Sequence, residues 1–178
     1  MSGLLLFFYG GVLHVITIEE QKKSFIKAQE VIGFPKQLNN DANNFNPKKG
    51  EVIGMLSIPS LNADLSIIEG TDPDDLEKGV GHFSNSSFPN QNNQILLSGH
   101  RDTVFRDLGK VKKNEELIIK LPTGEYTYEI FDFKIVDANN QTIIQSTYPE
   151  EILVLTTCYP FSYVGNAPDR YVIYAKRK

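Results

Sequence analysis

The single cysteine of the chain lies where a nucleophile could be positioned. Cys158 ends the apolar run EILVLTT, and after a loop of eleven residues Arg170 opens a second apolar run, RYVIYAK. Two strands joined by a loop of that length are most simply antiparallel neighbours. Because neighbouring strands lie about 4.8 Å apart, this pairing would place the thiol and the guanidinium beside one small space.

A thiol becomes a nucleophile when a base or a cation favours its thiolate. The chain has three histidines, His14, His82 and His100. His14 lies in an apolar N-terminal segment, and His82 lies between a predicted helix end and a polar loop. His100 directly follows the predicted strand QILLSG and precedes RDT, a helix-capping sequence. Since rigid structure would hold it, His100 is the preferred acid/base partner of Cys158.

Each of these residues also has a purely structural interpretation. A lone cysteine at a strand end is more often a small buried hydrophobic residue than a catalyst. A lone histidine is more often a hydrogen-bonded structural residue, and Arg170 could pair with Asp169 or another surface acid. The spacing alone therefore leaves catalytic and structural roles open.

Composition indicates one soluble, disulfide-free domain with a short appendage. The 178 residues are 40% hydrophobic and 22% charged, as in ordinary globular proteins. The net charge of −4 argues against a nucleic-acid partner, which needs clustered Lys and Arg. One cysteine excludes an intramolecular disulfide framework and disfavours a cysteine-based zinc site. The acids near residues 72–77 fit the start of a helix, so we predict no obligatory metal.

The first fifty residues differ from the rest. Residues 3–18 are mostly apolar, although a comfortable bilayer span needs about 20 residues and no cleavage site follows. We interpret residues 1–18 as a membrane anchor. Residues 19–32 have apolar side chains near helical spacing and predict an amphipathic helix. Residues 33–50 are rich in Asn, Lys and Pro, which is typical of a linker.

From residue 51 onward, seven short apolar runs rich in Ile, Val, Tyr and Phe predict strands. Within residues 126–136 the apolar face changes parity, which predicts a bulge. Short helices are predicted over TDPDDLEKG, where Asp72 is the N-cap and Gly79 the stop, and over DTVFRDLG. Seven or eight short strands with few helices predict a mainly β fold, either a small closed barrel or a sandwich.

Longer motifs resemble a known family. LTTC, at residues 155–158, is similar to the tail of the sortase signature TLxTC, with Val154 where the family usually has Thr. SGHRDTVFRDLGKV resembles the histidine segment of class D sortases, and TTCYPFSYVGNAPDRYVIYAK resembles their cysteine-to-arginine segment. The similarity extends over about residues 51–176. It implies a closed eight-stranded sortase β-barrel over residues 51–178, with two short helices and the N-terminal helix or anchor.

The resemblance also implies an activity. Sortases of Gram-positive bacteria are cysteine transpeptidases that cleave an LPxT-type sorting motif in a secreted protein and transfer the acyl group to a peptidoglycan amine. It implies Cys158 as nucleophile, His100 as acid/base and Arg170 as the cation that stabilises substrate and oxyanion. It implies no cofactor. It places the barrel outside the cell, held by a single-pass anchor.

The loop YPFSYVGNAP, which follows Cys158, carries several apolar groups. They could line a groove for the Leu-Pro of the motif, or they could cap the end of the barrel. The candidate substrate-binding residues are Thr157, Tyr159, Phe161, Tyr163 and Val164.

Three other functions fit parts of this pattern. A binding module with an inert cysteine would form no acyl-enzyme. A hydrolytic cysteine protease would cleave without an added amine. A redox-sensing thiol would be oxidised reversibly whether or not Arg170 is present.

Overall fold

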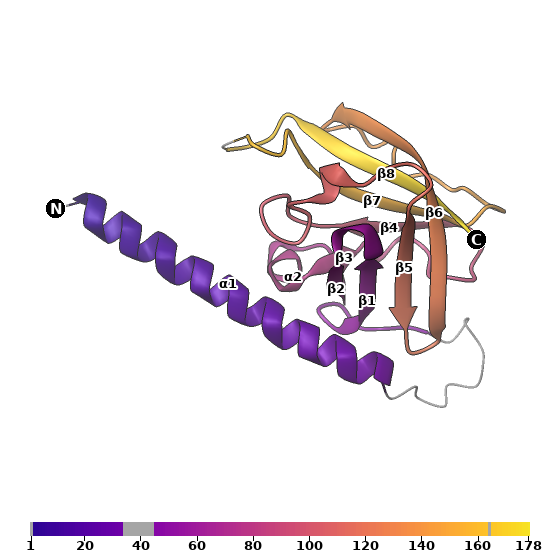
Figure 1. Cartoon of the computed structure of the whole chain (residues 1–178), viewed down its shortest axis with the longest axis horizontal. Coiled ribbons are helices and arrows are strands. Elements are labelled where there is room, and N and C mark those ends of the chain that lie inside the picture. Colours follow the sequence, from indigo (N-terminus) through magenta and orange to yellow (C-terminus); the bar gives the residue numbers. More distant parts are fainter. Residues whose placement is uncertain (1, 34–44, 164) are drawn as a thin grey trace.

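Eight strands close into one barrel (Figure 1), in the order β1-β2-β3-β4-β7-β8-β6-β5. The computed structural model describes residues 2–33, 45–163 and 165–178. The strands are β1 (Val52–Ile58), β2 (Ala63–Glu69), β3 (Val80–His82), β4 (Gln94–Ser98), β5 (Glu116–Leu121), β6 (Gly124–Asp137), β7 (Ile152–Tyr159) and β8 (Asp169–Arg177). The predicted mainly β closed barrel is confirmed. Strand β3 was missed in the sequence because three residues, one of them Gly81, are too few to give an apolar pattern.

The register of β4, β7 and β8 brings three chain segments to one place. β7 and β8 pair antiparallel with Cys158 opposite Arg170, so the pairing predicted from the loop length is confirmed. β4 runs parallel to β7 with Ser98 opposite Thr156. The chain beyond β4, which carries His100, therefore emerges beside the end of β7.

The predicted bulge lies in β6, where the register with β8 shifts between Ile130 and Asp132. Before it, Tyr126, Tyr128 and Ile130 are buried at alternate positions, whereas Phe131 is exposed. The first part of β6 pairs with β5 and the later part with β8. The bulge thus bends one long strand so that it closes the barrel.

Apolar residues form two clusters, one on each face of the central strands. Side chains at alternate positions of β4 and β7, including Leu97 and Leu155, fill the barrel interior. The intervening positions, Leu96 and Val154, belong to a second cluster with Ile143 from the β6–β7 connection. This connection consequently covers part of the outer face of β4 and β7.

Helix α1 (Ser2–Gly33) is continuous and runs along one side of the barrel, with its N-terminal end extending beyond it (Figure 1). Ser24 and Ala28 are buried, and such small side chains permit close approach to the barrel. In the part of the chain that the structure describes, no helix has both the length and the hydropathy required to cross a membrane. Residues 34–44, most of the predicted linker, lie outside the described residues.

One short α-helix and two 3-10 helices accompany the barrel in the described residues. Helix α2 (Pro73–Lys78) begins as predicted, with a capping box between Asp72 and Asp75. The predicted helix over residues 102–109 instead forms successive turns that end in the 3-10 helix η3 (Leu108–Lys110), and a further 3-10 helix, η2 (Pro59–Leu61), follows β1. The turns allow both Phe105 and Leu108 to reach the core.

Candidate active site

A pocket of about 500 Å³ lies on the outer face of β4 and β7. Cys158, His100 and Arg170 all line it. Among the described lining residues there is no Asp or Glu, and Arg170 is the one Lys or Arg. An arginine without a neighbouring carboxylate favours negative charge on a thiolate or on a developing oxyanion.

Strand alternation determines where the thiol points. Val154 on β7 belongs to the outer cluster, and both Thr156 and Cys158 follow it at steps of two and line the pocket. The side chain of Cys158 is therefore on the pocket side of the sheet, and it is half-buried.

Backbone carbonyls hold the guanidinium of Arg170. Its Nη1 donates to the carbonyl of Ala167 at 3.3 Å and to that of Asp169 at 3.0 Å. Within the described residues Arg170 forms no ion pair, so the alternative in which it pairs with the Asp169 carboxylate is not found. The remaining N–H groups are left to bind a ligand in the pocket.

His100 is exposed but sits on backbone that is held firmly from three sides. The Gly99 N–H donates to Thr156 O at 3.2 Å, and the Thr157 hydroxyl donates to Gly99 O at 2.7 Å. The Phe105 N–H donates to the His100 carbonyl at 3.0 Å. Thr157, a candidate substrate-binding residue, lines the pocket, but its hydroxyl is used for this internal bond.

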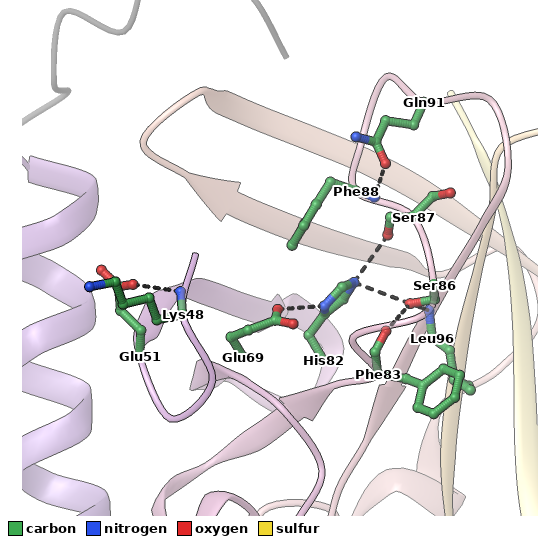
Figure 2. A network of polar contacts seen from close by, with 10 residues as sticks. All are labelled: Lys48, Glu51, Glu69, His82, Phe83, Ser86, Ser87, Phe88, Gln91 and Leu96. Atoms are coloured by element: carbon green, nitrogen blue, oxygen red, sulfur yellow. Dashed lines mark hydrogen bonds and ion pairs between the residues drawn. The ribbon is translucent and has the colours of Figure 1, made fainter. Parts of the chain in front are cut away.

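His82 lies in a separate buried network (Figure 2). Its Nδ1 is 2.7 Å from Glu69 Oε2, while its Nε2 is 3.1 Å from both Ser87 O and Ser86 Oγ. The ring stacks on Phe88 with centroids 4.3 Å apart. Both nitrogens are engaged and the side chain is only 1% exposed. His82 consequently serves as a structural link between β2, β3 and the β3–β4 connection.

Arg101 was not identified from the sequence, although it adjoins His100. It is 7% exposed and donates to three carbonyls of the β7–β8 loop: Pro160 at 3.1 Å, Tyr163 at 2.6 Å and Gly165 at 3.0 Å. Arg101 thus fastens the loop that joins Cys158 to Arg170. The only sequence signal was an arginine beside the candidate histidine.

The aromatic residues of the β7–β8 loop pack on one another. Phe161 contacts Tyr159 and Tyr171 edge to face, with centroids 5.8 and 5.3 Å apart. Burial, and secondarily the nearby Tyr159, raises the pKa of Tyr171. Tyr163 is exposed, and none of the described aromatic candidates lines the 500 Å³ pocket. Val164, the remaining candidate, lies outside the described residues.

The apolar part of the pocket comes from other elements, and the sequence analysis missed it. Phe83 follows β3, Leu96 lies in β4, and Ile143 and Ile144 come from the β6–β7 connection. Consecutive isoleucines in an otherwise polar connection were the available signal. Only the closed barrel reveals that they face the same groove as Cys158.

Comparisons with known proteins identify the family. The sortase domain model matches residues 56–178. The chain is 49% identical to sortase D of Bacillus subtilis (strain 168), over 99% of this chain and 93% of that protein. It is 25% identical to sortase A of Listeria monocytogenes, over 81% of this chain and 70% of that protein.

Solved structures agree with this assignment. A sortase D5 transpeptidase of Clostridium perfringens superposes with a TM-score of 0.78, at 24% identity, covering 90% of this chain and 99% of that chain. A sortase C of the same species, solved with the C-terminal cell wall sorting motif, has a TM-score of 0.68 at 25% identity, covering 90% and 89% of the two chains.

The chain belongs to the sortase family, whose members are cysteine transpeptidases acting at the cell surface on proteins with a sorting motif. Within that family it is a class D sortase.

Proposed function

We propose that Cys158, His100 and Arg170 carry out the transpeptidation, with an LPxT-type motif as substrate. The observation that supports this most directly is that all three line one pocket, with Cys158 and Arg170 opposite each other in register. Their predicted roles are nucleophile, acid/base and oxyanion-stabilising cation.

The arrangement supports a two-step reaction. The Cys158 thiolate attacks the carbonyl of the motif's Thr, and the N–H groups of Arg170 stabilise the oxyanion. His100 donates a proton to the departing amine as the C–N bond breaks, which leaves a thioester. An incoming amine attacks this thioester, His100 removes its proton, and the thiolate departs. The peptide bond lost in the first step is replaced by one formed in the second.

The apolar part of the pocket fits the Leu-Pro end of the motif. Leu96 is opposite Val154 in the β4–β7 register, four residues before Cys158, or about 13 Å along the strand. The Leu of the motif lies three residues before its Thr, about 10 Å away in an extended peptide, and its side chain adds to this reach. With Thr at Cys158, the Leu of the motif would therefore lie beside Leu96 and Ile143.

The acceptor in this proposal is an amino group of peptidoglycan or its precursor, and the acyl donors are secreted proteins with the motif. The predicted anchor in residues 1–18 would hold the enzyme at the outer face of the plasma membrane in a single pass. The proposal includes no cofactor and no metal.

Product analysis tests this proposal. The chain is incubated with an LPxT-type peptide library, with and without a diamino-peptide. We expect ligated product when the amine is present, and loss of product in Cys158→Ala and Arg170→Ala. Cleavage that yields only the free acid despite added amine would indicate a hydrolase. Peptide binding without cleavage by folded protein would indicate a binding module.

A further inference from the structure

A second, smaller pocket of about 250 Å³ adjoins the catalytic pocket. The two share Ile144, which lines both. The smaller pocket lies between the β3–β4 connection, which supplies Asn85 and Ser87, and the β6–β7 connection, which supplies Gln145. No role in the reaction proposed above uses it.

Two hydrogen-bonded side chains, the buried Gln94 and the half-buried Asn93, give this pocket a fixed floor. Gln94, 4% exposed, donates from Nε2 to Ile143 O at 2.8 Å and accepts from the Gln145 N–H at 3.3 Å. Asn93 Oδ1 accepts from the Ser146 hydroxyl at 3.2 Å and from the Thr147 N–H at 2.8 Å. These bonds tie the start of β4 to the β6–β7 connection, so the pocket is held by the fold.

Its open polar groups are uncharged. Asn85, Ser87 and Gln145 line the pocket, and no hydrogen bond among the described residues uses their side chains. In Figure 2 it is the carbonyl of Ser87, not its hydroxyl, that contacts His82. Amide and hydroxyl groups each donate and accept, which matches the uncharged polar side chains of a substrate, such as those of Ser and Asn.

The position of the pocket relative to Cys158 identifies which part of a substrate it would meet. Gln94 is opposite Ile152 in the β4–β7 register, and Cys158 lies six residues further along β7. Six residues of parallel strand measure about 20 Å. In an extended peptide the Leu of the motif lies three residues, or about 10 Å, from its Thr, and the two residues before the motif lie about 13 and 17 Å from it, which brings their side chains toward the small pocket.

We infer that the small pocket is a subsite for the two substrate residues immediately before the sorting motif, and that it favours uncharged polar residues there. The inference rests on the proposed function, because it takes the motif's Thr to lie at Cys158. Asn85 and Gln145 supply the specificity by hydrogen bonding to the side chains of these two substrate residues. The gain is in binding, shared by ground state and transition state, so it appears in KM.

The test compares four peptides with the same motif and the same sequence after it. One begins at the motif, and the others carry Ser-Asn, Leu-Leu or Asp-Asp before it. For the wild-type chain, kcat/KM with the Ser-Asn peptide should exceed that of the bare motif about tenfold, as expected for two net hydrogen bonds after ordering costs. The Leu-Leu and Asp-Asp peptides should gain less than about twofold, since a Leu side chain forms no hydrogen bond and an Asp carboxylate can accept but not donate and loses hydration when it enters an uncharged pocket.

A double variant locates the effect. Asn85→Ala combined with Gln145→Ala should remove most of the increase in kcat/KM that the Ser-Asn peptide shows. It should leave kcat/KM for the bare-motif peptide unchanged. Ser84→Ala, an exposed residue of the same connection that does not line the pocket, is the matched control and should keep the full advantage.

The outcomes separate this inference from the proposed function. Equal kcat/KM for bare and extended peptides would overturn the subsite while leaving the transpeptidase intact. An equal gain from Leu-Leu, or a double variant that slows every peptide alike, would also overturn it. If no peptide reacts, the proposed function fails and the subsite falls with it.

Discussion

Replacing Arg101 by Met tests whether the loop after Cys158 must be fastened for catalysis. Arg101 donates three hydrogen bonds to carbonyls of that loop at 2.6–3.1 Å while being 7% exposed. A hydrogen bond involving a charged group contributes about 1.5–3 kcal/mol. Because Tyr163 and Gly165 are exposed, water can replace Arg101 at two of the carbonyls. We therefore expect the substitution to cost the equivalent of one such hydrogen bond, about 1.5–3 kcal/mol in stability.

The larger effect should be on the reaction. The loop ends at Cys158 on one side and Arg170 on the other, so its loosening displaces the two groups relative to each other. Displacements of about 1 Å at a reacting centre can cost about 100-fold in rate. We expect kcat per folded molecule to fall by that order, with KM changed much less. Arg101→Lys should retain only part of the wild-type kcat, because one ammonium group cannot reach three carbonyls in the fork geometry of a guanidinium.

The assay combines steady-state kinetics on a motif peptide with thermal unfolding followed by circular dichroism. Arg106→Met is the matched control, since Arg106 is exposed and its side-chain hydrogen bonds within the described residues both go to the Asp102 carbonyl. It should keep the wild-type kcat and change stability by less than about 0.5 kcal/mol. A folded Arg101→Met variant with wild-type kcat would refute the positioning role. A stability loss with unchanged kcat per folded molecule would reduce Arg101 to a structural residue.

Three further substitutions follow from the hydrogen bonds. Thr157→Val removes a buried bond to the carbonyl of Gly99 and should lower the free energy of unfolding by about 1–3 kcal/mol in urea titrations. Burial, together with the bond to Glu151, raises the pKa of Tyr128 in the fold, so its contribution is complete below about pH 10 and is lost above it. Unfolding titrations should therefore show a steeper alkaline loss for wild type than for Tyr128→Phe. His82→Ala should lower the melting temperature, because its carboxylate partner remains buried and unpaired.

For each of these three substitutions, one result would contradict the expectation. An unchanged unfolding free energy for Thr157→Val would mean that the Gly99 carbonyl is satisfied otherwise. Parallel alkaline curves would show that Tyr128 titrates alike in folded and unfolded chains. A His82→Ala variant that unfolds as wild type but has lost all activity would point to a catalytic role for that histidine.

The pairing of Cys158 with Arg170 was predictable because it depends on features of one short chain segment. Loop length and strand length alone predicted that Cys158 and Arg170 are antiparallel neighbours, and the parity change in β6 predicted its bulge. The start of α2 followed from Asp72 and the proline after it. In each case the residues that determine the feature lie close together in the sequence.

The parts that were missed depend on contacts between distant segments. Arg101 contacts a loop about sixty positions away in the chain, and Ile143 reaches the groove only because the β6–β7 connection folds over β4. His82 and Glu69 meet because β2 and β3 pair in parallel, with each opposite the other. No spacing rule connects such residues, so only the closed barrel identifies these partners.

The most direct test of the proposed mechanism is the intact mass of the chain during reaction with a motif peptide. We expect an added mass equal to the acyl part of the peptide, mapped to Cys158 and removed when a diamino-peptide is supplied. The adduct should be absent in Cys158→Ala and should form slowly in His100→Ala, where no group protonates the departing amine. Peptide cleavage by Cys158→Ala at the wild-type rate, or an adduct mapped to another residue, would contradict the proposed mechanism.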